Sequence, residues 1–348
     1  MDALTILKPD DWHVHLRDGA ALASVVRFTA ERFGRAIVMP NLKPPIATTA
    51  LAAAYLSRIR GALPPGSGFV PLMTLYLTEA TPPDEIDRAA ASGFVHGVKL
   101  YPAGATTHSD AGVTDIRKTY AVLERMQQLG MPLLVHGESA RADVDVFDRE
   151  TCFIDELLAP LTERFAALKV VFEHITTARA VEFVAAAREG VAATITPQHL
   201  LHNRNAIFAG GIRPHYYCLP ILKRERDRVA LVQAAVSGNP RFFLGTDSAP
   251  HERSTKETSC GCAGMFTAHA AIELYAEVFE ESGHLDRLEA FASHFGADFY
   301  GLPRHEDRIT LKREPWVVPE RYPFGEGTVV PYRAGETIAW RLAPVEQA

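Results

Sequence analysis

The sequence predicts an α/β protein whose main part is a (β/α)8 TIM barrel, followed by a C-terminal extension of helices and strands. The first observation is that eight apolar runs of strand length alternate with helical segments between about residues 10 and 247. The second is that these runs are continuously apolar, which is typical of parallel strands buried on both faces. A doubly wound open sheet is the alternative, but no Gly-x-Gly-x-x-Gly motif follows the first strand.

The order of the elements follows from where the apolar runs and the helical stretches begin and end. Pro82 starts one helix, where a missing N–H costs nothing, and Gly130 and Gly190 end two others. Pro40 and Pro197 close two strands. The expected strands are 11–18, 36–40, 69–77, 95–101, 132–136, 169–174, 191–196 and 241–247. The expected helices between them are 20–32, 48–63, 82–92, 115–129, 152–167, 178–189 and 224–236.

The chain continues past the last barrel strand. Residues 267–282 and 285–299 are expected to be helical, and from Arg308 onward the chain becomes strand-like and rich in proline. We expect this part, about 300–348, to pack on the barrel as an extension. A barrel of this length commonly forms one domain. The sequence therefore predicts a single domain over residues 1–348.

The composition excludes several classes of function. The net charge of -6 is mild and mixed along the chain, and no basic tract is present, so nucleic acid is not an expected partner. No apolar run is long enough to span a membrane. The first eight residues are too short and acidic for a signal peptide. The four cysteines are few and irregularly spaced, which predicts reduced thiols in a cytoplasmic protein.

The first strand carries the first candidate site residues. Side chains two apart in a strand point to the same face, so His13, His15 and Arg17 are expected to project together. Two imidazoles on one strand face form a pair of metal ligands suited to zinc and related ions. The alternative is an ordinary buried strand with two hydrogen-bonded histidines.

Further candidates stand at the ends of later strands, where the chemistry of a TIM barrel is placed. Lys99 is in the fourth strand, His136 and His174 end the fifth and sixth, and Asp247 ends the eighth. Each residue also has an alternative interpretation without a metal. The histidines could be hydrogen-bonded structural residues, Asp247 could be a turn residue or a helix cap, and Lys99 could be a solvated charge. Their convergence at one end of the expected barrel favours a metal site.

Lys99 poses a chemical problem at such a site. An ammonium offers no lone pair and repels cations. Lys99 fits a metal site only if it is deprotonated or covalently changed, for example by carbon dioxide to an anionic carbamate with two oxygen ligands. The loop that follows it, 102–112, is built of small polar residues, which suggests mobility.

These residues stand in motifs that resemble the amidohydrolase superfamily and, within it, the short bacterial type of the dihydroorotase family. The likeness spans almost the whole chain. The matching motifs are Pro9 to Asp18, Met39 to Leu42, Val98 to Pro102, Val135 to Glu138, Phe172 to Thr176 and Gly245 to His251. No departure from the family pattern occurs at these positions.

The resemblance implies a metal centre. It implies two Zn²⁺ ions bridged by an N6-carboxylated Lys99 and a hydroxide. One ion would take His13, His15 and Asp247, and the other His136 and His174. Other metals also suit such ligands.

The resemblance also implies a reaction: the interconversion of N-carbamoyl-L-aspartate and L-dihydroorotate in pyrimidine biosynthesis. Asp247 would accept the proton of the attacking water and pass it to the leaving nitrogen. The substrate-binding set would be Arg17, Asn41 and His251 at the carboxylate, the backbone of Leu219 and Ala263 at the ring amides, and Thr106 and Thr107 on a closing loop. A homodimer is the expected assembly.

Two rival readings stay open from the sequence. A hydantoinase or allantoinase would act on another cyclic amide, but such relatives usually carry a β-sandwich built partly from residues before the first barrel strand. His13 comes too early in this chain to leave room for one. A non-catalytic scaffold relative is the other rival, and such relatives typically lose the metal ligands that this chain keeps.

Overall fold

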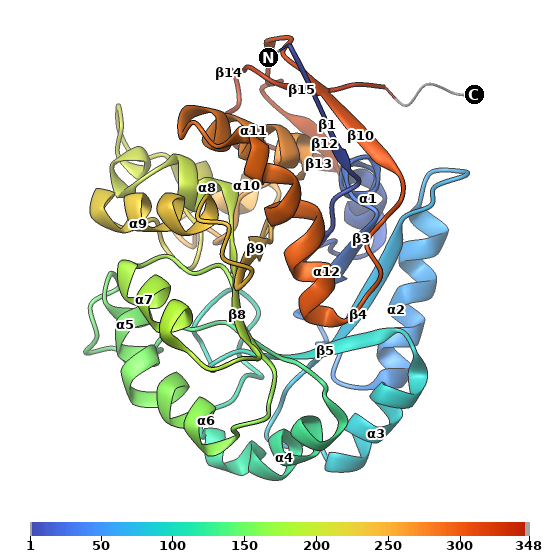
Figure 1. Cartoon of the computed structure of the whole chain (residues 1–348), viewed down its shortest axis with the longest axis vertical. Helices are drawn as coiled ribbons and strands as arrows, with labels where there is room; N and C mark the ends of the chain where they lie inside the picture. Colours follow the sequence, from blue (N-terminus) through green and yellow to red (C-terminus); the bar gives the residue numbers. More distant parts are fainter. Residues whose placement is uncertain (1, 345–348) are drawn as a thin grey trace.

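Eight parallel strands form one sheet in the order of the sequence, and helices surround it (Figure 1). The computed structural model describes residues 2–344. The sheet closes on itself between its first and last strands, because Asp247 N donates to His13 O at 2.9 Å and His15 N donates to Ser248 O at 3.0 Å. The predicted (β/α)8 barrel is confirmed. Its strands are β2 (Asp11–Val14), β3 (Arg35–Val38), β4 (Val70–Tyr76), β5 (Val95–Leu100), β6 (Leu133–Val135), β7 (Val170–Phe172), β8 (Val191–Ile195) and β9 (Phe242–Leu244).

The helices begin and end largely where the sequence signals stand. Thr48 caps one helix by accepting from Leu51 N at 3.3 Å, and Gly93 and Gly130 end two others in the left-handed conformation. The long helix expected over 152–167 is interrupted by a π-helical turn at Ile154–Leu158. The helices are α1 (Gly19–Arg32), α2 (Thr49–Ala62), α3 (Pro83–Ser92), α4 (Tyr120–Leu129), α5 (Arg149–Phe153), α6 (Ala159–Arg164), α7 (Ala178–Ala186), α8 (Pro197–Leu201), α9 (Glu225–Ala235), α10 (Arg253–Lys256), α11 (Ala271–Glu281) and α12 (Phe295–Tyr300).

The first barrel strand is shorter than predicted. β2 ends at Val14, and Arg17 has a φ of 61°, in the left-handed region. The predicted strand over 11–18 is therefore wrong beyond Val14, and the two-residue alternation cannot be extended to Arg17. The cause is the closure of the barrel, since His15 bonds to Ser248 beyond the end of β9 and the chain then turns toward α1.

The C-terminal extension pairs with an N-terminal strand that the sequence did not reveal. β1 (Ala3–Leu7) pairs antiparallel with β10 (Arg308–Lys312), and β15 (Arg341–Leu342) adds to the other edge of β10. Figure 1 shows this small sheet beside the barrel, near the N-terminus. The strand-like character expected from Arg308 onward is confirmed by β10 and by the pair of β11 (Trp316–Val317) and β14 (Thr337–Ile338). The last hairpin is β12 (Tyr322–Phe324) with β13 (Gly327–Val329). Residues 345–348 of the predicted extension lie outside the described part of the chain.

An apolar plug fills the barrel below the strand ends. It joins inward side chains of seven barrel strands to Ala297 of α12, and Trp12 stacks on Tyr300 with ring centroids 4.6 Å apart. Trp12, Leu134, Val171 and Phe243 belong to it, and each precedes in the sequence, by one to four positions, a candidate site residue that lies on the same strand or just after its end. The strand members are Trp12, Ile37, Met39, Leu72, Leu134, Val171, Ala192 and Phe243. The plug therefore supports the residues above it.

We predict that Gly296→Ala in α12 destabilises the protein. A Cβ at Gly296 would overlap with the indole ring of Trp12, and overpacking of this kind costs about 1–3 kcal/mol. Urea unfolding measures the free energy. Gly61→Ala in α2 is the matched control, because nothing lies within 4 Å of the added Cβ and a helical alanine is favoured by roughly 0.5–1 kcal/mol. Equal stabilities of the two variants would contradict the packing argument.

Candidate active site

A small cavity lies at the carboxyl ends of the barrel strands. Its lining includes every predicted site residue except Lys99, which lies below it and is fully buried. Tyr101, Ala249 and Gly264 line it as well. A water-sized sphere can occupy only about 20 Å³ of it, which is room for about one water molecule. Access for a cyclic substrate therefore requires part of the wall to move.

His13, His15 and Asp247 form the tightest cluster in this cavity. The Nε2 atoms of the two histidines are 3.3 Å apart, and Asp247 Oδ1 lies 3.3 Å from His13 Nε2 and 3.2 Å from His15 Nε2. Ligand atoms about 2.0–2.1 Å from one tetrahedral ion lie roughly 3.3–3.4 Å apart. The three atoms therefore already have the spacing of one metal-ligand set.

The second expected pair, His136 and His174, is close but arranged differently. Their ring centroids are 4.8 Å apart. The ligand atoms that cluster with His174 belong to His13 and Glu173 instead. His174 Nδ1 is buried and has no hydrogen-bond partner among residues 2–344. His136 uses Nε2 at 2.9 Å from Glu138 Oε2, a contact that fixes the ring orientation as carboxylates do for metal-ligating histidines.

The backbone turns sharply where two of these ligands leave their strands. His174 has a φ of 43° and Asp247 a φ of 45°. Left-handed backbone outside glycine is uncommon, though Asp and His tolerate it better than most residues, and it costs about 1–3 kcal/mol unless the surroundings hold it. At His174 the backbone is held in this conformation by Thr194, whose Oγ1 accepts a hydrogen bond from His174 N at 2.7 Å. This strained backbone directs both side chains into the cavity.

Asp11 holds the corresponding turn at Asp247. Its Oδ1 accepts from Thr246 N at 2.8 Å and from His13 N at 3.1 Å, and its Oδ2 accepts from Thr246 Oγ1 at 2.6 Å. Burial raises the pKa of Asp11 to about 7, against the lowering effect of these hydrogen bonds. Sequence reasoning included Asp11 in a motif but assigned it no role. It connects the backbone of His13, a candidate ligand, to that of Thr246, the residue directly before Asp247.

The charges of the cluster favour an ionised Asp247. Burial alone would raise the pKa of Asp247, but the charge of His13 and the hydrogen bonds from His13 and His15 lower it well below its usual range. Burial also lowers the pKa of His15 to about 4. For His13, burial acts to lower the pKa, but the carboxylates of Glu173 and Asp247 together raise it to about 9. A metal binding at His13 would have to displace that proton.

Lys99 lies under the histidines, and its amine contacts the carboxylate of Glu173. Neither residue is exposed, which excludes the reading of Lys99 as a solvated charge. Burial lowers the pKa of Lys99 in spite of this neighbour. Glu173 also lies 3.0 Å from His13 Nδ1. The sequence analysis missed Glu173; its signal was a glutamate directly before His174 in a buried run, where glutamate is rare without a partner.

Arg17 reaches the cavity by a route other than the predicted one. Its Nε donates to Pro250 O at 2.8 Å, and its Nη2 lies 3.0 Å from His251 Nε2. His251 Nε2 is also 3.0 Å from Ala263 O. Burial lowers the pKa of Arg17 to about 10, so the guanidinium keeps its charge at neutral pH. The structure thus brings Arg17, His251 and Ala263 together on one side of the cavity.

The loop 102–112 closes the cavity from above. Asn41 Nδ2 donates to Thr107 O at 3.3 Å, so Asn41 contacts this loop as well as lining the cavity. Ser109 ties the loop to itself, because its Oγ accepts from Thr106 N at 3.0 Å and donates to Thr106 O at 2.6 Å. Few bonds join the loop to the rest of the site, which suits the part of the wall that has to move.

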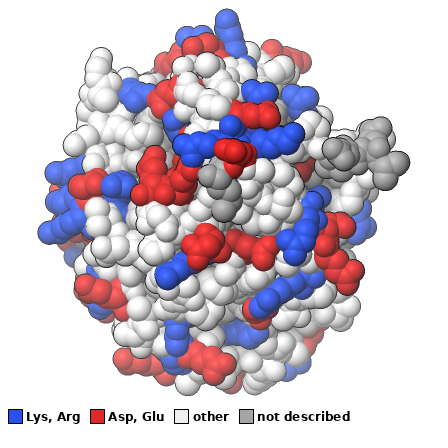
Figure 2. Space-filling model, turned by 45° about the horizontal axis from the view of Figure 1, so that its top comes forward, with Lys and Arg blue, Asp and Glu red and all other residues white. Residues whose placement is uncertain are grey.

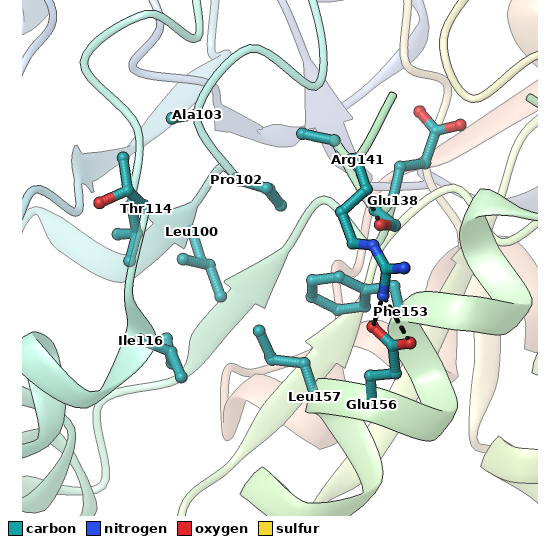
Figure 3. A pocket seen from close by; sticks show the side chains of 13 residues that line it. Leu100, Pro102, Ala103, Thr114, Ile116, Glu138, Arg141, Phe153, Glu156 and Leu157 are labelled. Atoms are coloured by element: carbon teal, nitrogen blue, oxygen red, sulfur yellow. Dashed lines mark hydrogen bonds and ion pairs between the residues drawn. The ribbon is translucent and has the colours of Figure 1, made fainter. Parts of the chain in front are cut away.

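A second hollow, of about 490 Å³, lies beside the site (Figure 3). Figure 3 shows aliphatic side chains such as Leu100 and Leu157 along its walls, with Arg141 paired to Glu156 at a distance of 2.9 Å. None of the predicted site residues lines it. Its size therefore does not make it the site of the chemistry.

The surface and the helices complete the description. Figure 2 shows one face of the molecule, on which Lys and Arg side chains are interspersed with Asp and Glu. Within residues 2–344, no helix combines the length and the apolar character needed to cross a membrane.

A barrel that gathers His, Lys and Asp side chains at its strand ends has the architecture of a metal-dependent hydrolase. The sequence pattern of the Amidohydrolase family matches residues 9–319, and the chain belongs to this family. The resemblance expected from the motifs is confirmed at the level of the superfamily.

The relatives define a narrower group. A dihydroorotase of Azoarcus sp. (strain BH72) is 66% identical over 344 residues, which cover 99% of this chain and 100% of that protein. The crystal structure of a dihydroorotase from Campylobacter jejuni matches with a TM-score of 0.90 at 36% identity, covering 99% of this chain and 98% of that one. The dihydroorotase from Saccharomyces cerevisiae, in complex with 5-fluoroorotic acid, matches with a TM-score of 0.90 at 33% identity over 99% of this chain and 100% of that one. Within the amidohydrolases, the chain groups with the dihydroorotases.

The first and last barrel strands meet at a seam, where Asp11 of β2 binds Thr246, which follows β9. We predict that Thr246→Val weakens this seam. The change keeps the side-chain volume but removes the hydroxyl that donates to Asp11 Oδ2, and losing a partner at a buried polar group costs about 1–3 kcal/mol. Unfolding in urea and metal titration of the folded protein measure the effect; both stability and metal affinity are expected to fall. Thr5→Val, at the exposed Thr5–Thr310 pair, is the control and should change stability by less than about 0.5 kcal/mol. Equal effects of the two changes would remove the seam from the argument.

Proposed function

We propose that the chain catalyses the reversible interconversion of L-dihydroorotate and N-carbamoyl-L-aspartate. The observation that carries the proposal is the juxtaposition, in one cavity, of the His13–His15–Asp247 cluster and the guanidinium of Arg17. The first can serve hydrolysis of an amide, and the second can bind a carboxylate. The dihydroorotases that are 66% identical over the full chain support the assignment of the substrate.

The residues present fit a metal centre. We propose two Zn²⁺ ions, the first held by His13, His15 and Asp247, whose ligand atoms lie 3.2–3.3 Å apart. His136 and His174 would hold the second, and the unpartnered Nδ1 of His174 supports this. Lys99 would join the two sites as a carbamate, formed when its nitrogen bonds to the carbon of carbon dioxide and loses a proton. When bound, such ions polarise a carbonyl and provide hydroxide at neutral pH.

Asp247 would move the proton of the reaction. In the direction of ring opening, the oxygen of water bonds to the ring carbonyl carbon and the bond from that carbon to the ring nitrogen breaks. Asp247 would accept the proton that the water loses and deliver it to the departing nitrogen, acting as general base and then general acid. Its low pKa keeps Asp247 ionised at neutral pH, so the side chain carries no proton before the water attacks.

Arg17, Asn41 and His251 would bind the substrate carboxylate. Arg17 is anchored through Nε to Pro250 O, and its Nη2 lies 3.0 Å from His251 Nε2, so the two side chains meet at the cavity that both of them line. A planar guanidinium matches a carboxylate with two parallel hydrogen bonds. The backbone of Leu219 and Ala263, which also lines the cavity, would hold the ring amides. Thr106 and Thr107 would close over the ring and keep bulk water out.

Two further expectations complete the proposal. On the resemblance to the dihydroorotase family we propose a homodimer, which light scattering of the purified protein tests directly. We also propose that the protein works in the cytoplasm as a single domain. A monomer over the working concentration range would remove the first of these without touching the assignment of the reaction.

The experiment that tests the function is a direct assay of ring opening. Purified protein is supplied with L-dihydroorotate, hydantoin and allantoin in parallel, and ring opening is followed spectroscopically. We expect turnover of L-dihydroorotate alone. Turnover of hydantoin or allantoin in its place would assign the chain to another cyclic amidase. No turnover of any of the three by metal-loaded protein would favour a non-catalytic role.

We predict that Asp247→Asn loses turnover while keeping the fold. The amide cannot take up the proton, and loss of general acid–base catalysis lowers kcat by about 100- to 10,000-fold. Because the other ligands remain, most of the metal should be retained. Metal content by mass spectrometry and a thermal melt provide the internal controls. Near-normal kcat in this variant would exclude Asp247 as the proton carrier.

We predict that Arg17→Met raises KM for L-dihydroorotate by about 10- to 100-fold, because charge-assisted hydrogen bonds to the carboxylate are lost. Steady-state kinetics measure the change. Arg27→Met on the outer face of α1 removes an exposed guanidinium and serves as the control, with no expected change in KM. An unaltered KM in Arg17→Met would take Arg17 out of the carboxylate site.

We predict that Lys99→Ala loses most activity and much of its metal, since the proposed carbamate bridge cannot form. A short carboxylic acid such as acetate could occupy the vacated space and supply two oxygen ligands, so added acetate should restore part of the activity. Activity and metal content are measured with and without acetate. Full activity of Lys99→Ala without any addition would show that the bridge is dispensable.

A further inference from the structure

Lys256 is a buried lysine outside the proposed metal and carboxylate sites. It ends α10, is 3% exposed, and directs its amine inward. Its Nζ donates to three backbone carbonyls: Tyr217 O at 3.0 Å, Cys262 O at 2.8 Å and Gly264 O at 2.7 Å. An ammonium has three donors, so each of its protons has an acceptor.

This arrangement is unusual for a buried charge. Buried lysines are normally paired with carboxylates, because an unpaired ammonium is costly to remove from water. Among residues 2–344, Lys256 has no carboxylate in ion-pairing distance, and three carbonyl dipoles replace it. Burial lowers the pKa of Lys256 to about 8, so the amine keeps its third proton at neutral pH.

The three carbonyls belong to two separate stretches of the cavity wall. Cys262 and Gly264 flank Ala263, and Tyr217 is two residues before Leu219; Ala263, Gly264 and Leu219 all line the cavity. The same Tyr217 oxygen also accepts from Gly264 N at 3.1 Å, so one backbone hydrogen bond links the two stretches beside Lys256. Lys256 therefore joins two loops, about 45 residues apart in the sequence, at the point where they line the cavity.

We propose that Lys256 is a positioning residue that sets the spacing between the backbone groups of Leu219 and Ala263, and with it the affinity for the ring amides of the substrate. The identity of that substrate rests on the proposed function. Lys256 does not touch the substrate itself. It also makes no hydrogen bond to His13, His15, His136, His174 or Asp247, so the metal ligands and the proton carrier stay in place without it.

This separation predicts a specific kinetic pattern. Contacts to the ring amides that exist in both the ground state and the transition state act on KM and leave kcat unchanged. Lys256→Met removes all three donors and keeps a side chain of similar length, and we expect KM to rise by about tenfold or more with kcat within about threefold of the starting protein. Lys256→Gln keeps two N–H donors and should give a smaller rise. Metal content should not change in either variant.

A second readout does not depend on activity. Hydrogen exchange followed by mass spectrometry should show faster exchange in peptides covering residues 214–220 and 257–266 of Lys256→Met, because the tether between the two loops is lost. Peptides from β2 and β7 should exchange as before. Lys312→Met, an exposed lysine on β10, is the matched control for loss of a lysine charge and should change neither KM nor exchange.

The outcomes separate this inference from the proposed function. If the unaltered protein does not act on L-dihydroorotate, the proposed function fails, and the exchange of the two loops still decides whether Lys256 tethers them. If the unaltered protein is active and Lys256→Met shows normal KM and normal exchange, the positioning role is overturned. A parallel fall of kcat and metal content would also overturn it, because that is the pattern of a general structural defect. Should Lys256→Met fail to fold, Lys256→Gln is measured instead, and an unchanged KM there counts against the proposal.

Discussion

The hydrogen bonds of one buried carboxylate, that of Asp11, hold the seam on which the rest of the site depends. A barrel has to join its first strand to its last, and here the joint lies directly beneath the candidate metal ligands. Asp11 binds the backbone of His13 on one side of the seam and the backbone and hydroxyl of Thr246 on the other. Beside them, the backbone hydrogen bonds that close the sheet, Asp247 N to His13 O and His15 N to Ser248 O, involve the three candidate ligands themselves. In this protein, closure of the barrel and the positions of the candidate metal ligands therefore depend on the same part of the structure.

The site divides its residues between rigid and movable parts of the molecule. The candidate ligands stand at strand ends above the apolar plug, where packing and backbone hydrogen bonds fix them. The residues proposed to meet the substrate stand on loops. Arg17 and His251 follow the closure of the barrel, and Thr106 and Thr107 lie on the loop that covers the cavity. Reacting groups need positions fixed to within a fraction of an ångström, while a wall that admits a substrate has to open.

Much of this arrangement could be predicted from the sequence, because its signals are local. Continuous apolar runs indicate buried parallel strands whichever fold contains them, and a histidine or aspartate at the end of such a run must lie at the carboxyl edge of the sheet. Arg17 shows the limit of that reasoning. Alternation placed it in the cavity, and it does line the cavity, yet β2 ends three residues earlier and the chain arrives there through a left-handed turn. The predicted position of Arg17 is therefore right, but the strand alternation from which it was predicted does not extend to Arg17.

The residues that the sequence analysis missed act through long-range contacts. The roles of Glu173 and Lys256 depend on what faces them: Lys99 and His13 in one case, and carbonyls from two distant loops in the other. Strand β1 was missed for the same reason, because an apolar stretch of five residues is a strand only if a partner exists, and its partner is β10, some 300 residues later. The pattern of residues within a short stretch of sequence does not predict contacts with residues far away in the chain.

That pairing has a consequence for synthesis on the ribosome. β1 emerges first, but β10, with which every residue of β1 pairs, is made only after residue 307. At about 5–20 residues per second, the first strand waits tens of seconds for its partner, and β2 waits almost as long for the segment after β9. The small sheet cannot form before residues 308–312 have been made, and the contact between Asp11 and Thr246 cannot form before residue 246 has been made. The candidate active site therefore cannot be assembled until its last ligand, Asp247, has been synthesised, and until then the edge of β2 has no partner on that side.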